Sequence, residues 1–180
     1  MLDTSDAGGG CAEPGGKPLR VKLLGEELVL FRAKNGQLGL IGAICPHRLA
    51  PLFYGRVEDD GLRCIYHGWK FAPGGKCLEM PNVPAELGFT DRIHHPGYPC
   101  VERGGIIWTY MGRAQELPAL PDLEFLRVDD DDRQYRLIFS GVQLSSSARR
   151  RHRSDPRHVA ALALRSGGRS VDRRQPARAA

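Results

Sequence analysis

The sequence predicts an all-β protein made of small antiparallel sheets. Short apolar runs alternate with polar residues, and glycine- or proline-containing turns of hairpin length separate them. No convincing amphipathic helix of ten residues or more precedes residue 140. About 125 residues of this kind are enough for one modest hydrophobic core.

The strands are expected in hairpins along the chain. Residues 19–24 and 27–33 flank Gly25-Glu26, and Asn35-Gly36 begins the reversal into residues 37–43. Two more hairpins follow: residues 64–72 with 75–81 around Pro73-Gly74-Gly75, and residues 98–102 with 106–111 around Arg103-Gly104-Gly105.

Between these hairpins, residues 81–99 are a proline-punctuated loop. His94-His95 precede Pro96 in this loop, and we interpret them as a solvated turn rather than a metal site. The expected core is apolar and aromatic, and comprises Leu23, Leu28, Leu30, Leu40, Ile65, Phe71, Ile106, Ile107, Trp108 and Tyr110.

Two short clusters of cysteine and histidine indicate a metal site. Cys45 and His47 are separated by one residue, and after sixteen intervening positions Cys64 and His67 are separated by two. Each pair can project from one tight loop toward one point. A tetrahedral zinc site is one interpretation, although zinc modules usually pair like ligands. A two-iron cluster is the other, because sulfur can bind one iron and imidazole the second.

The motif C-x-H-x16-C-x2-H, followed by Gly68-Trp69, resembles the Rieske [2Fe-2S] domain of aromatic-ring oxygenases of the phthalate-dioxygenase type. The resemblance covers roughly residues 17–142, through segments 18–81, 98–112 and 117–125. It implies that two hairpin loops bind the cluster. Cys45 and Cys64 would hold one iron, and His47 and His67 the other, with the histidines facing solvent as the electron exit.

The resemblance also bears on the redox potential. Respiratory Rieske proteins place a serine where this chain has Trp69, and they join the two loops by a disulfide at positions that look equivalent to Ala50 and Tyr66. Without that hydroxyl, we expect a potential toward the negative end of the Rieske range, roughly −150 to +300 mV. For Trp69 and Arg48, a core or surface role and a tuning role both stay open.

Full-length relatives imply further components. Electrons would come from NADH through a reductase or ferredoxin, the complete subunit would form a homotrimer, and a mononuclear Fe(II) would activate dioxygen to hydroxylate or demethylate an aromatic substrate. That iron takes two histidines and a carboxylate. His152, Asp155 and His158 have part of this spacing, which we interpret as chance, so no catalytic residue is assigned.

The domains follow from changes in composition. Residues 1–16 are expected to be disordered, 17–117 to form the Rieske domain, and 118–143 to be a linker and the start of a truncated catalytic domain. Residues 144–180 are expected to be a disordered Arg/Ala-rich tail. Residues 148–180 carry a net charge of +8 against −3 for residues 1–147. Such a tail could bind nucleic acid; we prefer a frameshift product and expect no nucleic-acid partner.

Two rival functions stay open, a stand-alone Rieske ferredoxin and a zinc-binding interaction module. The five cysteines form no even disulfide framework, and Cys11, Cys77 and Cys100 are interpreted as ordinary thiols. The sequence has neither a signal-peptide pattern nor an apolar run of membrane-spanning length. A cytoplasmic protein without a membrane partner is therefore expected.

Overall fold

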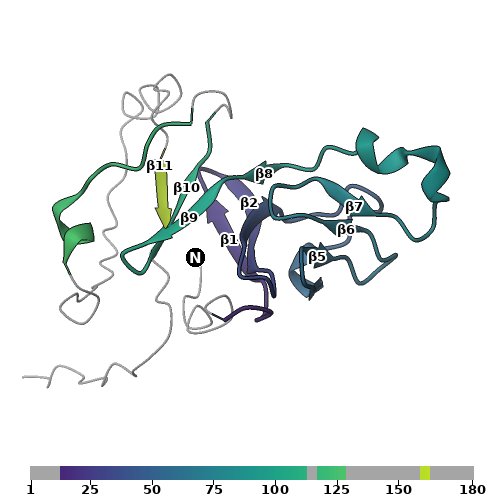
Figure 1. Cartoon of the computed structure of the whole chain (residues 1–180). Coiled ribbons are helices and arrows are strands. Elements are labelled where there is room, and N and C mark those ends of the chain that lie inside the picture. Colours follow the sequence, from purple (N-terminus) through teal and green to yellow (C-terminus); the bar gives the residue numbers. More distant parts are fainter. Residues whose placement is uncertain (1–12, 113–116, 129–158, 163–180) are drawn as a thin grey trace, which may run out of the picture.

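The computed structural model describes residues 13–112, 117–128 and 159–162. These residues form three small sheets in which every strand pair is antiparallel, and no α-helix occurs among them. Figure 1 shows the β9–β11 sheet at the left, the β1–β2 strands in the middle and the β5–β7 strands at the right. The expected all-β class is confirmed.

The middle sheet has the strand order β1-β2-β3-β8. The turn between its first two strands lies at Leu24 and Gly25, one residue before the expected position, and both have positive φ, 49° and 91°. The expected reversal at Asn35-Gly36 joins the second strand to the third. The strands are β1 (Leu19–Leu23), β2 (Glu26–Arg32), β3 (Leu38–Gly42) and β8 (Gly97–Tyr98).

Strand β2 is covered on both faces, which explains its unbroken apolar run. Val29 and Phe31 point into the core shared with the β4–β7 sheet, whereas Leu28 and Leu30 pack in a second cluster that includes Ile107 of the third sheet. These four residues of β2 are each at most 1% exposed. The alternation of side chains along a strand thus places the middle sheet between the other two.

The second sheet carries one of the two candidate ligand loops. Its strand order is β4-β5-β6-β7, and the loop joins β5 to β6. The other regular elements of the described residues are short 3-10 helices, of which three precede β9 in the chain and one lies between β10 and β11. The strands are β4 (Arg56–Val57), β5 (Leu62–Arg63), β6 (Lys70–Phe71) and β7 (Cys77–Glu79); the helices are η2 (Leu52–Tyr54), η3 (Ala85–Leu87), η4 (Phe89–Arg92) and η6 (Glu124–Arg127).

The third sheet consists of β9 (Cys100–Arg103), β10 (Ile106–Tyr110) and β11 (Val159–Leu162). Strand β11 pairs with β10 although it belongs to the segment 144–180 that we expected to be disordered. The rest of that segment, with His152, Asp155 and His158, lies outside the described residues, as do residues 1–12.

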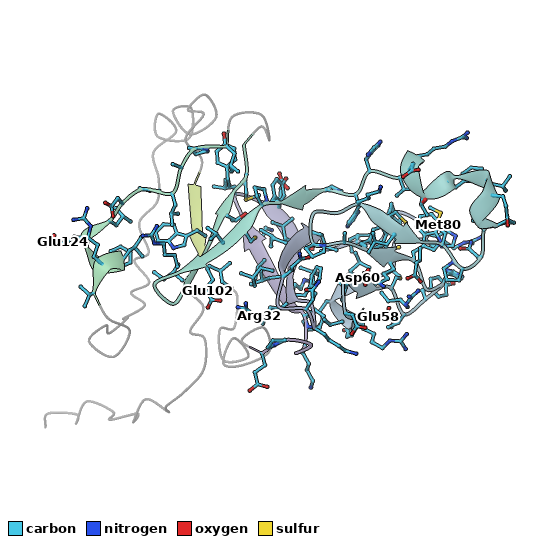
Figure 2. The ribbon with its side chains drawn as sticks, viewed as in Figure 1. Arg32, Glu58, Asp60, Met80, Glu102 and Glu124 are labelled. Carbon is cyan, nitrogen blue, oxygen red and sulfur yellow. The ribbon has the colours of Figure 1, made fainter. Side chains whose placement is uncertain are left out.

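A partly buried ion pair joins the middle sheet to the third sheet. Arg32 Nη2 of β2 lies 2.7 Å from Glu102 Oε2 of β9. Figure 2 shows the two side chains facing one another between their strands.

Two expectations about buried residues were wrong. Ile65, expected in the core, is 65% exposed, because it lies in a loop between two candidate ligands rather than in a strand. His95, expected in a solvated turn, is 8% exposed; its Nε2 lies 3.0 Å from the carbonyl oxygen of Gly42, and its ring packs against Phe71. Burial lowers the pKa of His95.

No helix among the described residues is long and apolar enough to cross a membrane.

Candidate metal centre

Two loops of the same construction carry the four expected ligands. The first loop, residues 45–50, begins at Cys45, and the second loop, residues 64–69, begins at Cys64. Each is closed at its base by an antiparallel pair of flanking residues. These pairs are Ile44 with Pro51, and Arg63 with Lys70.

The backbone hydrogen bonds inside the two loops correspond one to one. In each loop the cysteine N–H donates to the carbonyl of the sixth position, and its carbonyl accepts from the N–H of the fifth. The distances are 2.9 Å (Cys45 to Ala50) and 3.0 Å (Leu49 to Cys45) in the first loop, and 2.8 Å (Cys64 to Trp69) and 3.1 Å (Gly68 to Cys64) in the second.

The fifth position of each loop has a left-handed backbone. Gly68 adopts it in the second loop with φ of 76°, and Leu49 in the first with φ of 57°. Glycine takes this conformation without steric cost, whereas for a leucine it is a strained outlier. A Cβ on Gly68 would also lie 3.1 Å from Pro81 Cγ. Both loops therefore contain the same left-handed turn, which in the first loop places a leucine in a strained conformation.

The loops bring the two thiols together inside the protein. Cys45 is 1% exposed and Cys64 is 3% exposed. Burial, with the adjacent Cys64, raises the pKa of the Cys45 thiol to about 11. A metal that binds here must displace the thiol proton, as metal–thiolate bonding requires. Two buried thiols side by side form a fitting donor set for one iron of a cluster.

The two histidines meet at the ends of the loops. Their ring centroids are 4.6 Å apart, with an angle of 62° between the planes. Burial first, then the charges of His67 and Arg48, lower the pKa of His47. This favours the neutral imidazole that binds metals. Both rings are partly exposed, so they lie nearer to solvent than the thiols.

The four candidate ligands thus form a cysteine pair and a histidine pair. In the part of the chain that the structure describes, no three or more His, Cys, Asp or Glu side chains are arranged to hold one metal ion. Two thiols and two imidazoles are also the donor set of a two-iron cluster that has one pair on each iron.

An ionic network supports the second loop, and no motif in the sequence indicates it. Arg63 donates to Glu58 Oε1 at 2.7 Å, to Glu79 Oε2 at 2.6 Å and, through Nη1, to the carbonyl of Gly68 at 2.7 Å. Hydrogen bonds from Arg63 lower the pKa of Glu58 to about 2. The members of this network are ordinary surface residue types. Only the assembly of β4, β5, β6 and β7 into one sheet brings them together.

A buried lysine belongs to the same network. Lys70 is 7% exposed, its ammonium contacts Asp60, and its Nζ lies 3.2 Å from Glu79 Oε1. The Asp60 hydrogen bond raises the pKa of Lys70. Figure 2 shows Glu58 and Asp60 close together beside this sheet.

Several large apolar side chains near the two loops are exposed, and one of them, Tyr66, contacts the ring of His67. They lie in the two loops or next to them, and their exposed fractions range from 37% to 74%. Where such side chains form one contiguous patch, they mark a surface that contacts another molecule. They are Ile44, Leu49, Phe53, Tyr54, Ile65 and Tyr66.

Comparison with known families agrees with this site. Residues 12–100, about half of the chain, match the family described as the Rieske [2Fe-2S] domain. The match includes both loops and all four candidate ligands.

Similar curated proteins are oxygenase subunits. The chain is 48% identical over 120 residues to the 3-chlorobenzoate-3,4-dioxygenase oxygenase subunit of Comamonas testosteroni, covering 67% of this chain and 28% of that protein. It is 44% identical over 107 residues to the phthalate 4,5-dioxygenase oxygenase subunit of Pseudomonas putida, and this match covers 59% of this chain and 24% of that protein. The chain therefore spans about a quarter of the length of these relatives.

A similar solved structure is dicamba monooxygenase with non-heme iron and dicamba. The TM-score is 0.50 with 36% sequence identity, and the alignment covers 59% of this chain and 32% of that one. The fold of the described domain is thus found within a larger oxygenase.

Proposed function

We propose, from the premise that residues 12–100 of this chain belong to the Rieske [2Fe-2S] domain family, that Cys45 and Cys64 bind one iron and His47 and His67 bind the other. The observation that carries this assignment is the correspondence of the two loops, each with a cysteine at its first position and the same pair of backbone hydrogen bonds. When bound, the cluster would supply one-electron transfer.

The residues of this chain would divide the work between interior and surface. Cys45 and Cys64 are buried, which keeps water from the sulfur side. The partly exposed rings of His47 and His67 lie where a partner could approach. The exposed apolar side chains in and beside the two loops support contact with another protein, because exposed apolar patches mark interaction sites. This geometry suits electron exit through the histidines.

We place the domain in the oxygenase component of an aromatic-ring oxygenase that hydroxylates or demethylates its substrate. The named relatives support this: two are dioxygenase oxygenase subunits, and another is 5,5'-dehydrodivanillate O-demethylase oxygenase subunit of Sphingobium, 43% identical over 107 residues. The electron donor we propose is an NADH-dependent reductase or a ferredoxin. A homotrimer and a mononuclear iron belong to the same proposal for the complete subunit.

The cytoplasm is the compartment we propose, because an NADH-dependent donor works there. The domain boundaries also stay proposals: residues 17–117 as the Rieske domain, residues 118–143 as the start of a catalytic domain, and residues 144–180 as a frameshifted tail. Sequencing the gene and translating the other reading frames downstream would decide the last of these.

The decisive experiment is metal analysis of anaerobically prepared protein. We expect red-brown protein with two irons and two acid-labile sulfides for each chain, as a [2Fe-2S] cluster requires. Reduction should produce an electron paramagnetic resonance (EPR) signal. Colourless protein that contains only zinc would instead favour the zinc-binding interaction module. A cluster that carries electrons from a reductase to a separate oxygenase would instead favour the ferredoxin-like carrier.

A further inference from the structure

Trp69 links the two loops through its side chain. Its backbone belongs to the second loop, but its indole stacks on the imidazole of His47 in the first loop. The ring centroids are 4.4 Å apart and the planes are parallel to within 1°. Trp69 is 7% exposed. A residue of one loop therefore covers the candidate ligand of the other.

Asn82 holds this indole from a third segment. The Trp69 Nε1–H donates to Asn82 Oδ1 at 2.7 Å. Asn82 follows β7 in the proline-punctuated loop, and its neighbour Pro81 packs against Gly68 of the second loop. An indole has one N–H and can donate only one such bond. The hydrogen bond thus orients the ring plane, and the stack passes that orientation to His47.

We infer that Trp69, oriented by Asn82, is a non-covalent clamp that joins the two loops and positions His47 as a ligand. This inference rests on the proposed function. It gives the chain an inter-loop connection where the positions that look equivalent to a disulfide hold Ala50 and Tyr66. Trp69 is a positioning residue, because it would act on the metal through His47. Among the ring contacts of the described residues, its indole contacts His47 and no other candidate ligand.

The clamp should also lower the redox potential. Reduction adds negative charge beside His47, and the face of an indole carries partial negative charge that opposes it. The buried indole also keeps water from one face of the imidazole, and solvent exposure is one of the factors that set the potential of such clusters. Removing the indole should therefore raise the potential.

The test compares Trp69→Leu and Asn82→Ala with two matched controls. Trp108→Phe removes another indole that is 7% exposed and donates to a carbonyl, that of Arg103 at 3.1 Å, but lies in a separate core cluster. Asn35→Ala removes another exposed asparagine whose Oδ1 accepts a hydrogen bond, from the N–H of Gln37 at 2.9 Å. Both controls should leave the cluster's properties unchanged.

Two measurements report on the metal rather than on folding: the midpoint potential by protein-film voltammetry, and the nitrogen hyperfine couplings of the reduced protein by pulsed EPR. We expect a higher potential in Trp69→Leu, a smaller rise in Asn82→Ala, and altered couplings for one of the two nitrogen ligands in both. If Trp69→Leu assembles no cluster, Asn82→Ala decides alone. Potentials and couplings equal to those of the controls would overturn the inference.

The result separates this inference from the proposed function. Iron and acid-labile sulfide in the unmodified protein test the function first. If they are present and the clamp variants behave like the controls, only the clamp is wrong. If they are absent, the cluster assignment fails before the clamp is examined.

Discussion

Arg63 donates a hydrogen bond from Nη1 to the carbonyl oxygen of Gly68, with 2.7 Å between the atoms. The same guanidinium is held by Glu58 and Glu79, so the second loop is tied to the ionic network at the base of its sheet. Gly68 follows His67 directly in the sequence. The position of a candidate ligand is therefore coupled to charges outside the loop.

Replacing Arg63 by leucine should destabilise the protein by about 1–3 kcal/mol, because partly buried charged groups lose their partners. Arg56→Leu is the matched control. Arg56 also contacts Glu58 Oε1 at 2.7 Å, but its side chain is 72% exposed. Exposed pairs contribute about 0–1 kcal/mol. Chemical unfolding followed by circular dichroism measures the free energy of unfolding of both variants. Equal losses of stability in the two would contradict the role of Arg63 in holding the second loop.

Gly68→Ala should cost about 1–2 kcal/mol, the penalty for a left-handed backbone in a residue with a Cβ. The new methyl would also press on Pro81, 3.1 Å away. Thermal unfolding gives the loss of stability, and the iron content shows whether the loop still binds metal. Gly74→Ala is the control, because a Cβ there meets no atom within 4 Å and its φ lies outside the left-handed range. A Gly68→Ala variant as stable as the unmodified protein would show that a Cβ at this position does not strain the turn.

Glu58 should make stability depend on pH in the acid range. Its pKa in the folded protein is lowered to about 2 from an ordinary value of 4.5. A lowered pKa contributes stability that is fully present above the ordinary value and is lost as pH falls toward the folded value. Glu58→Gln should thus cost roughly 2 kcal/mol at pH 7.

The difference between unmodified protein and Glu58→Gln should shrink between pH 4.5 and pH 2. Urea unfolding of both proteins at pH 7 and pH 3.5 measures it, and any acid lability of the metal site is common to the two. A difference that stays constant with pH would show that the Glu58 charge does not stabilise the fold.

His67→Cys should retain a cluster and shift its potential downward, because a thiolate donates more charge than an imidazole. All-cysteine [2Fe-2S] proteins of the plant type lie near −400 mV, below the Rieske range. His94→Cys provides the control, since His94 is exposed and lies outside both loops. Voltammetry that finds the same potential in His67→Cys and unmodified protein would show that His67 is not a ligand.

The potential of the unmodified protein should lie toward the negative end of roughly −150 to +300 mV. Trp69 stands where respiratory Rieske proteins place a serine hydroxyl, and its indole N–H is directed to Asn82 rather than to the ligand pairs. A hydrogen bond to a cluster sulfur would stabilise the reduced state, and this side chain supplies none. Protein-film voltammetry that gives a value near the top of the range would contradict the expectation.

The hairpins were predictable because turn chemistry is local. Asn35-Gly36 and Gly104-Gly105 stand between apolar runs, and the structure turns at both. Ile65 was misplaced because its apolar character suggested a core residue, whereas its position between Cys64 and His67 puts it on an exposed loop. His95 was misplaced because its burial depends on Gly42 of β3, where a Cβ would lie 3.0 Å from the imidazole Cε1.

The amino-acid sequence alone determined the β class, the hairpin order and the four candidate ligands, because these follow from local periodicity, turn residues and the spacing of reactive side chains. Tertiary structure alone decided what surrounds those ligands. The contact of Asn82 with Trp69, the stack of Trp69 on His47 and the tie of Arg63 to Gly68 depend on distances across loops and strands. Such contacts leave no periodic signal in a sequence, since common residue types at unrelated spacings make them.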